Sequence, residues 1–117
     1  MPLASECLFC RIVARDEPAE VVHATDRIMA FRDRYPRAPT HILLIPKDHI
    51  ESVAELTEKD GAVLAELFTA AAHLAKAEEV DRTGYRLVVN TGPDAGQSIF
   101  HLHLHLLGGR TLSWPPG

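Results

Sequence analysis

Three histidines occupy alternate positions near the end of the chain, His101, His103 and His105, within the run Ile99–Leu107. An imidazole can act as nucleophile, proton carrier or metal ligand near neutral pH. Side chains of a β-strand alternate between its two faces, so a strand here predicts three imidazoles on one face, about 6.6 Å apart, with leucines opposite. Such a row is costly to bury and hard to explain as packing. It therefore predicts a chemical site.

The segment before these histidines carries polar donors. Residues 90–98 read NTGPDAGQS, in which Asn90, Gln97 and Ser98 supply side-chain donors. The glycines of this loop allow backbone N–H groups to approach an anion. A fourth histidine, His41, opens the apolar run HILLI after a proline-containing stretch. Together these features predict a polar site that an anion can approach.

Cys7 and Cys10 are the only cysteines of the chain, in the order CLFC. A disulfide between cysteines this close in sequence cannot cross-link distant parts of a fold. In a reducing cytosol the spacing favours a metal site or a redox pair over a structural disulfide.

Composition narrows the class of protein. With 117 residues, 46% hydrophobic and 24% charged, the chain is expected to form one ordered domain over residues 1–117. The net charge is −4 and no run of Lys or Arg stands out, which disfavours nucleic acid as a partner. No apolar run is long enough for a membrane span, and the N-terminus lacks the regions of a signal peptide. We therefore expect a cytoplasmic protein without a membrane partner.

Hydrophobic periodicity predicts an α+β fold, with one helix covering one face of an antiparallel sheet and the histidines on the other face. The expected elements are a short helix in 7–15, strands at 20–24, 27–31 and 41–45, a helix over 58–79, and strands at 85–89 and 99–107. Thr57 is the expected N-cap of the long helix, with Asp60 three residues on.

The long helix carries one apolar face, and its members recur at three- and four-residue spacing. They are Leu64, Leu67, Phe68, Ala71, Leu74 and Ala75. One helix and five strands make a modest core for this length, which favours burial against a second copy of the chain.

Short motifs spread over nearly the whole chain carry a resemblance to a known family. They are Ala38–His41, Ile45–Lys47, Gly96–Ser98, the alternating histidines of 101–107, Gly108–Arg110 and Trp114–Gly117. With them the sequence resembles the histidine triad (HIT) family, and within it the HINT branch of nucleotide-binding phosphoramidases. The resemblance implies a HIT-like fold, a five-stranded antiparallel sheet with one long and one short N-terminal helix, whose sheets are joined across a homodimer.

The resemblance also implies an activity, hydrolysis of the P–N bond in purine nucleoside 5′-phosphoramidates such as AMP-linked amines, without a catalytic cofactor. His103 would attack phosphorus to form a nucleotidyl-histidine, its tautomer fixed by the carbonyl of His101. His105 and Ser98 would hold the phosphate and serve the leaving group. The remaining catalytic candidates are Asn90, a donor to the phosphate; His41, a support for the triad; and Gln97.

Further residues would bind the nucleotide. The nucleoside would lie against Phe9, Ile12 and Phe31, although ordinary core packing is an alternative for each. The carboxylate of Asp33 would bind the ribose hydroxyls. The C-terminal tail, residues 108–117 with Trp114, would pack near the partner subunit's active site.

In a subset of the family the cysteine pair belongs to a zinc site. The remaining ligands would be His49 and His101, which gives a closed Cys₂His₂ set and hence a structural Zn²⁺. This assignment requires that His101 part from the other two histidines.

Two other functions are compatible with the residues. The first is a nucleotide-binding scaffold with weak or vestigial catalysis. The second is a metal-dependent hydrolase that uses the histidine row as ligands, since His-x-His is suitable ligand spacing.

Overall fold

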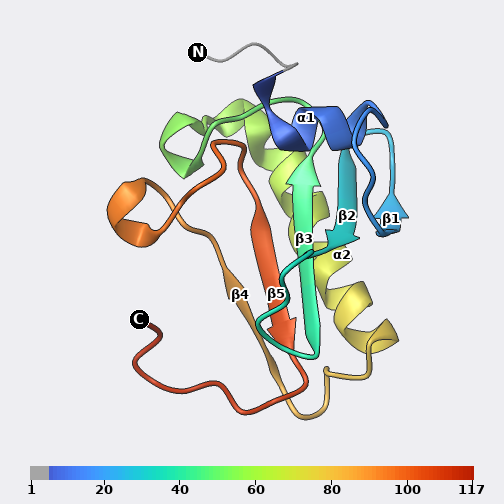
Figure 1. The fold of residues 1–117 in the computed structure, drawn as a ribbon, viewed down its shortest axis with the longest axis vertical. Helices are drawn as coiled ribbons and strands as arrows, with labels where there is room; N and C mark the ends of the chain where they lie inside the picture. Colours follow the sequence, from blue (N-terminus) through green and yellow to red (C-terminus); the bar gives the residue numbers. More distant parts are fainter. Residues whose placement is uncertain (1–5) are drawn as a thin grey trace.

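The computed structural model describes residues 6–117, and these form one antiparallel sheet with helices on both of its faces (Figure 1). The α-helices and strands are α1 (Leu8–Val13), β1 (Val21–Ala24), β2 (Ile28–Arg32), β3 (Thr40–Pro46), α2 (Gly61–Ala77), β4 (Tyr85–Val88) and β5 (Leu104–Gly108). Short 3₁₀ helices accompany them, including η2 (Val53–Glu55), η3 (Glu58–Asp60) and η4 (Pro93–Ala95). The strand order β1-β2-β3-β5-β4 is antiparallel throughout, so the predicted fold class is confirmed. Within the described residues, none of the helices combines the length and the apolar character that crossing a membrane requires.

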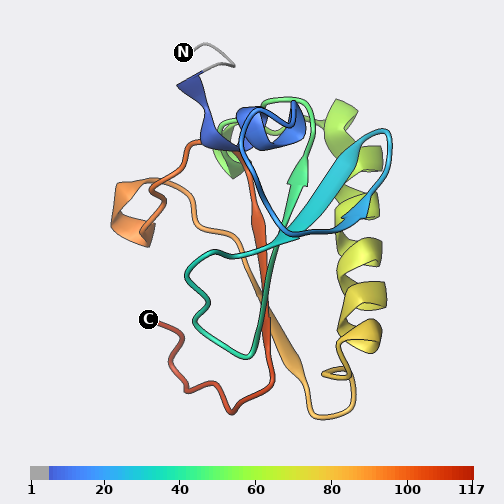
Figure 2. The ribbon, with the colours of Figure 1, turned by 45° about the vertical axis from the view of Figure 1, so that its right-hand side comes forward.

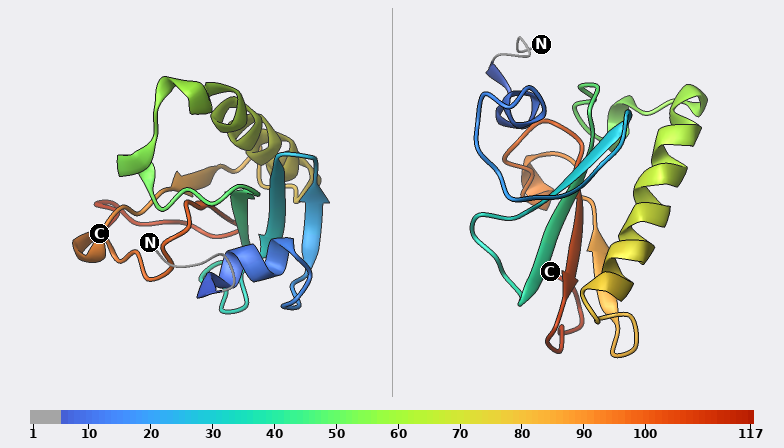
Figure 3. Two further views of the ribbon diagram at one scale, coloured as in Figure 1. Left: turned by 90° about the horizontal axis from the view of Figure 1, so that it is seen from above. Right: turned by 90° about the vertical axis from the view of Figure 1, so that its right-hand side faces the viewer.

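The two faces of the sheet are covered by different helices. α2 runs along one face, and α1 lies across one end of the other (Figures 2 and 3). Alternation along the central strands divides the buried side chains accordingly. Ile42 and Leu44 of β3 pack in the core beneath α2. Leu43 and Ile45 pack in a second core with Phe9 of α1. Both faces of β3 are therefore buried.

The long helix begins with a capping box. The hydroxyl of Thr57 accepts from the backbone of η3, and the Asp60 carboxylate accepts the Thr57 N–H at 2.9 Å. The predicted N-terminal signal is therefore present, although it caps a 3₁₀ turn that leads into α2. The predicted apolar face is wrong at Phe68, which is 50% exposed. This side chain lies about 100° around the helix from buried Leu67, at the edge of the buried stripe.

The predicted histidine strand is shorter than its sequence pattern. β5 begins at Leu104, so His101 and His103 lie in irregular chain before it. The pairing with β3 ends at Leu104, and the N–H of Leu102 instead donates to the carbonyl of Ile50 at 2.6 Å. The chain has left the ladder at this point, so strict alternation no longer holds. Prediction of one continuous strand over the three histidines is therefore wrong, and His101 is released from their common face.

Candidate active site and metal centre

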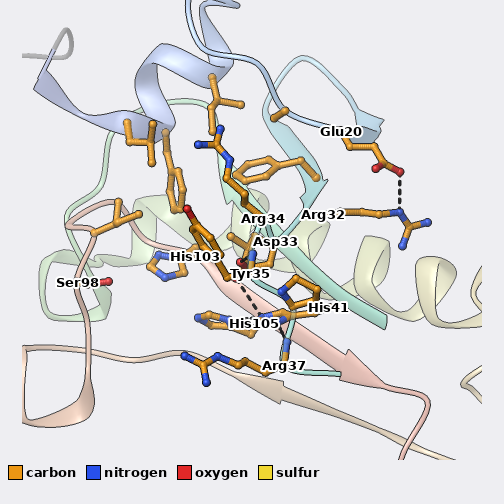
Figure 4. Close-up of a pocket in the computed structure, with 18 of the residues that line it drawn as sticks. Glu20, Arg32, Asp33, Arg34, Tyr35, Arg37, His41, Ser98, His103 and His105 are labelled. Atoms are coloured by element: carbon orange, nitrogen blue, oxygen red, sulfur yellow. Dashed lines mark hydrogen bonds and ion pairs between the residues drawn. The ribbon is translucent and has the colours of Figure 1, made fainter. Parts of the chain in front are cut away.

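A pocket of about 920 Å³ opens on the α1 side of the sheet (Figure 4). Its volume is that of a site for a small organic ligand. Side chains from α1, β2, the 33–39 segment, the 90–98 loop and β5 line it. The predicted site residues among them are Phe9, Ile12, Phe31, Asp33, His41, Asn90, Ser98, His103 and His105.

His103 presents an unprotonated nitrogen to the pocket. Its Nδ1 lies 2.6 Å from the carbonyl oxygen of His101, as expected from the sequence. A carbonyl only accepts, so Nδ1 carries the proton, and Nε2 keeps its lone pair. Burial lowers the pKa of His103, which keeps the ring neutral. The ring of Phe9 packs against it edge-on, with centroids 5.1 Å apart. The arrangement is that of a positioned, neutral nucleophile.

His41 and His105 form a hydrogen-bonded pair, and a backbone amide that contacts His41 determines which ring donates. The backbone N–H of Arg37 donates to Nδ1 of His41 at 3.0 Å, so a neutral His41 carries its proton on Nε2. That Nε2 lies 2.9 Å from Nδ1 of His105 and 3.4 Å from the Asp33 carboxylate. Nδ1 of His105 therefore accepts, and its own proton sits on Nε2.

The pKa shifts favour the neutral form of both rings. Burial, with the nearby His103 and His41, lowers the pKa of His105 to about 4. Burial also lowers the pKa of His41, against the opposing effect of Asp33. Both rings are consequently neutral at pH 7. Neighbouring histidines thus have opposite tautomers: His103 offers a lone pair and His105 offers an N–H.

This pair of imidazoles can carry out nucleophilic displacement. The ring centroids of His103 and His105 are 5.0 Å apart, so one reacting centre can face both. Nε2 of His103 can attack an electrophile, while the N–H of His105 stabilises an oxygen or leaving group on it. No metal is needed for either role.

One predicted catalytic residue, Gln97, lies outside the pocket. Gln97 is buried and does not line the pocket: its Oε1 accepts from the Gly92 N–H at 2.9 Å, and its Nε2 donates to the carbonyls of Glu51 and Ile99 at 2.8 and 3.2 Å. It holds the loop that carries Ser98, and a catalytic contribution of Gln97 stays a prediction.

Trp114 is 81% exposed and lies outside the pocket of its own chain. The predicted nucleotide contact of this residue is therefore not made within one chain.

Some pocket residues were not identified from the sequence. Arg34, Tyr35 and Arg37 line the pocket, and the Arg37 amide determines the tautomer of His41. The available signal was a pair of basic residues and an aromatic one in the segment DRYPRAP. Its two prolines indicated only that this segment lies outside the sheet.

A second cluster lies beside the pocket, where α1 meets the chain before β5. Cys7, Cys10, His49 and His101 place one ligand atom each within 4.8 Å of the others. Sγ of Cys7 is 3.3 Å from Nδ1 of His101, and Sγ of Cys10 is 3.4 Å from Nδ1 of His49. Tetrahedral zinc holds sulfur and nitrogen ligands about 3.5 Å apart. His101 has parted from the other histidines, as the zinc assignment required.

The chemistry of these donors fits a divalent cation. Nε2 of His101 lies 2.8 Å from the carbonyl oxygen of Pro46, which leaves the Nδ1 lone pair directed at the sulfurs. Burial and the adjacent Cys7 raise the pKa of the Cys10 thiol to about 11, a cost that a bound cation offsets. The four residues form a closed Cys₂His₂ set suited to structural zinc.

Comparison with known proteins agrees with this architecture. A family model described as the HIT domain matches residues 14–112. An uncharacterized HIT-like protein of Synechococcus elongatus is 46% identical over 115 residues, which cover 98% of this chain and 100% of that protein. A 14 kDa zinc-binding protein of Zea mays is 44% identical over 115 residues, 97% of this chain and 89% of the maize protein.

A solved structure shows the same fold. The crystal structure of a HIT family hydrolase from Legionella pneumophila Philadelphia 1 superposes with a TM-score of 0.93 at 49% sequence identity. The match covers 95% of this chain and 99% of that one.

Proposed function

Because the chain belongs to the HIT domain family, we propose that it is a hydrolase of the HINT type, which cleaves the P–N bond of purine nucleoside 5′-phosphoramidates. Hydrolase chemistry in general is supported by the similarity to a HIT family hydrolase. The observation that carries the specific proposal is the opposite tautomers of His103 and His105 in one pocket. A displacement at phosphorus requires a lone pair on one side and a proton donor for the leaving group.

The reaction then proceeds in two displacements. Nε2 of His103 attacks the α-phosphorus and forms a P–N bond to the ring, while the bond to the amine breaks. The Nε2–H of His105 donates a hydrogen bond to the departing nitrogen, which takes its proton from an adjacent water molecule, and the Nε2–H of His41 holds His105 in this tautomer. The hydroxide left by that water then attacks phosphorus and releases the nucleoside monophosphate from His103.

Other pocket residues supply binding. Phe9, Ile12 and Phe31 give the base an apolar wall, and Asp33 is placed in the same pocket for the ribose hydroxyls. Asn90 and Ser98 serve the phosphate oxygens. A zinc at the Cys₂His₂ set would hold α1 against the sheet and leave His103 free to react.

The proposal includes an assembly and a location. We propose that one domain over residues 1–117 forms a homodimer in the cytoplasm, in which Trp114 of the 108–117 tail lies near the partner's pocket. AMP-type or GMP-type compounds are its nucleotide substrates.

Turnover of an adenosine 5′-phosphoramidate with a fluorescent amine tests the activity. We expect AMP and free amine as products, a reaction that survives a chelator while the circular dichroism stays native, and loss of turnover in His103→Ala. His73→Ala, on the exposed side of α2, is the control and should retain full activity. Tight AMP binding without turnover would instead identify a nucleotide-binding scaffold. Activity lost on chelation and restored by metal, with the fold intact, would identify a metal-dependent hydrolase.

A further inference from the structure

Two arginines at the pocket have no acidic partner among the residues that the structure describes. The other charged lining residues are compensated. Arg32 binds both oxygens of Glu78 at 2.7 and 2.9 Å and one oxygen of Glu20 at 3.0 Å. Asp33 accepts the Tyr35 N–H and faces His41. Among residues 6–117, no carboxylate forms an ion pair with the other two arginines of the lining, Arg34 and Arg37.

Arg37 is anchored by its backbone on both sides. Its N–H donates to Nδ1 of His41 at 3.0 Å, and its carbonyl accepts from Nε of Arg110 at 3.0 Å. Its side chain is exposed and, in the view of Figure 4, extends along the end of the pocket that holds His105. The guanidinium charge contributes to the lowered pKa of His41, in agreement with this position. Backbone contacts thus fix where the side chain starts, while its charged end stays open to a ligand.

The contact to His41 does not need an arginine. Any residue other than proline would supply the same amide at position 37, so the guanidinium itself is unexplained by the triad. A guanidinium offers five donors in a planar fork and matches a carboxylate or phosphate with two parallel hydrogen bonds. The chain as a whole carries a net charge of −4, so a cationic rim at this pocket runs against the average charge of the protein.

We propose that the Arg37 guanidinium forms a subsite for an anionic group on the leaving amine. The inference rests on the proposed function, in which His105 faces the leaving group. The preferred substrates are therefore nucleoside phosphoramidates of amines that carry a carboxylate or phosphate near the scissile nitrogen, such as those of amino acids with a free carboxyl group.

Arg34 provides a matched comparison from the same segment. Its Nη2 reaches the carbonyl of Pro18 at 3.5 Å, and in Figure 4 its side chain lies toward α1. Removal of the Arg34 charge lowers the net charge of the pocket lining by one, as removal of the Arg37 charge does. The change at Arg34 lies at the end of the pocket away from His105. The two variants therefore separate a local contact from a general electrostatic effect.

The experiment compares three adenosine 5′-phosphoramidates, those of glycine, of glycinamide and of phosphoethanolamine. In the unaltered protein we expect kcat/KM for an anionic leaving group to exceed that for glycinamide by about 10-fold. Arg37→Gln should reduce this ratio to about 1, with the glycinamide reaction changed by less than roughly 3-fold. Arg37→Lys should retain part of the ratio, and Arg34→Gln most of it. The ratio of kcat/KM to that of glycinamide is measured for the glycine compound and for the phosphoethanolamine compound. The larger of these two ratios shows whether the subsite prefers a carboxylate or a phosphate.

Equal kcat/KM for all three substrates, or a ratio unchanged in Arg37→Gln, would overturn the proposal. Turnover of the glycinamide compound tests the proposed function separately. If no compound turns over, calorimetric dissociation constants for the same three ligands with His103→Ala and with the double variant His103→Ala, Arg37→Gln give the same ratio as a binding measurement. An equal affinity for charged and neutral ligands there would also overturn the subsite.

Discussion

Among residues 6–117, two clusters of potential metal ligands lie close together, and one of these two has the chemistry of a metal site. Cys7, Cys10, His49 and His101 form the first, and Asp33, His41 and His105 the second. Both clusters contain residue types that can bind a metal, and in each the ligand atoms lie within 4.8 Å of one another, so distance does not separate them. The difference lies in where the imidazole protons are held.

In the first cluster, the Nε2–H of His101 donates to the Pro46 carbonyl, so the Nδ1 lone pair faces the cysteine sulfurs. In the second, the Arg37 amide occupies the lone pair of His41, so the nitrogen that faces His105 bears a proton. A protonated nitrogen cannot bind a metal. The backbone groups that contact the two histidines therefore have opposite effects. The Pro46 carbonyl accepts the proton of His101 and leaves a lone pair for a metal, whereas the Arg37 amide donates to His41 and leaves an N–H that faces His105.

The largest expected effect comes from breaking the first cluster. Cys10→Ser should lower bound zinc from about one equivalent to less than a tenth, because a closed tetrahedral set loses a thiolate. The unfolding free energy should fall by about 4 kcal/mol at free zinc a thousand times the dissociation constant. Metal analysis and thermal unfolding measure both.

Asp33→Asn is the matched change in the second cluster, and it should leave the zinc content at one equivalent. Two equivalents of zinc in the unaltered protein, or a loss of zinc in this variant, would contradict the assignment of the two clusters.

The next effect concerns the direction of the His41–His105 hydrogen bond in the second cluster. His41→Gln removes the ring that fixes His105, so we expect kcat to fall by roughly 10–100-fold with a smaller change in KM. Nitrogen NMR of the imidazoles should show the Nε2–H form of His105 in the unaltered protein and a mixture in the variant. His23→Gln, on β1, serves as the control. An unchanged His105 tautomer would show that the Arg37–His41 contact does not set it.

A smaller effect is expected on acid stability. The pKa of His105 is lowered to about 4, mainly by burial, against an ordinary value of 6.5. The unfolded chain binds this proton first, so the neutral ring contributes its full stability above pH 6.5 and loses it as the pH falls toward 4. We expect about 1–3 kcal/mol from this group, allowing for solvent screening.

Urea unfolding of Cys10→Ser with and without His105→Asn, at pH 7.5 and 4.5, isolates this contribution from that of the metal. The asparagine variant should lose less stability on acidification. An equal loss in both proteins would assign the acid sensitivity to other groups.

The fold could be predicted from periodicity and short motifs, because its elements depend on local signals. The continuous apolar run of β3 and the capping box before α2 are such signals. The candidate site divides differently. Residue types gave the triad and the cysteine pair, yet the parting of His101 from His103 depends on where the β3–β5 ladder ends.

The Arg37 contact could not be predicted for a related reason. The donor to His41 is a backbone amide, which every non-proline residue possesses, so the side-chain sequence carries no trace of it. The burial of Gln97 could not be predicted either, because a buried amide that holds a loop together and one that contacts a ligand have the same sequence signature.

The short helix α1 contributes to both regions at once. Cys10 points into the metal cluster, while Phe9 and Ile12 line the pocket. If a metal stabilises the ordered position of α1, it also strengthens the binding of the proposed nucleotide that packs on this helix. Thermodynamic linkage makes this relation reciprocal. A bound nucleotide should then tighten metal binding by the same factor by which the metal tightens nucleotide binding, which makes zinc affinity a reporter of pocket occupancy.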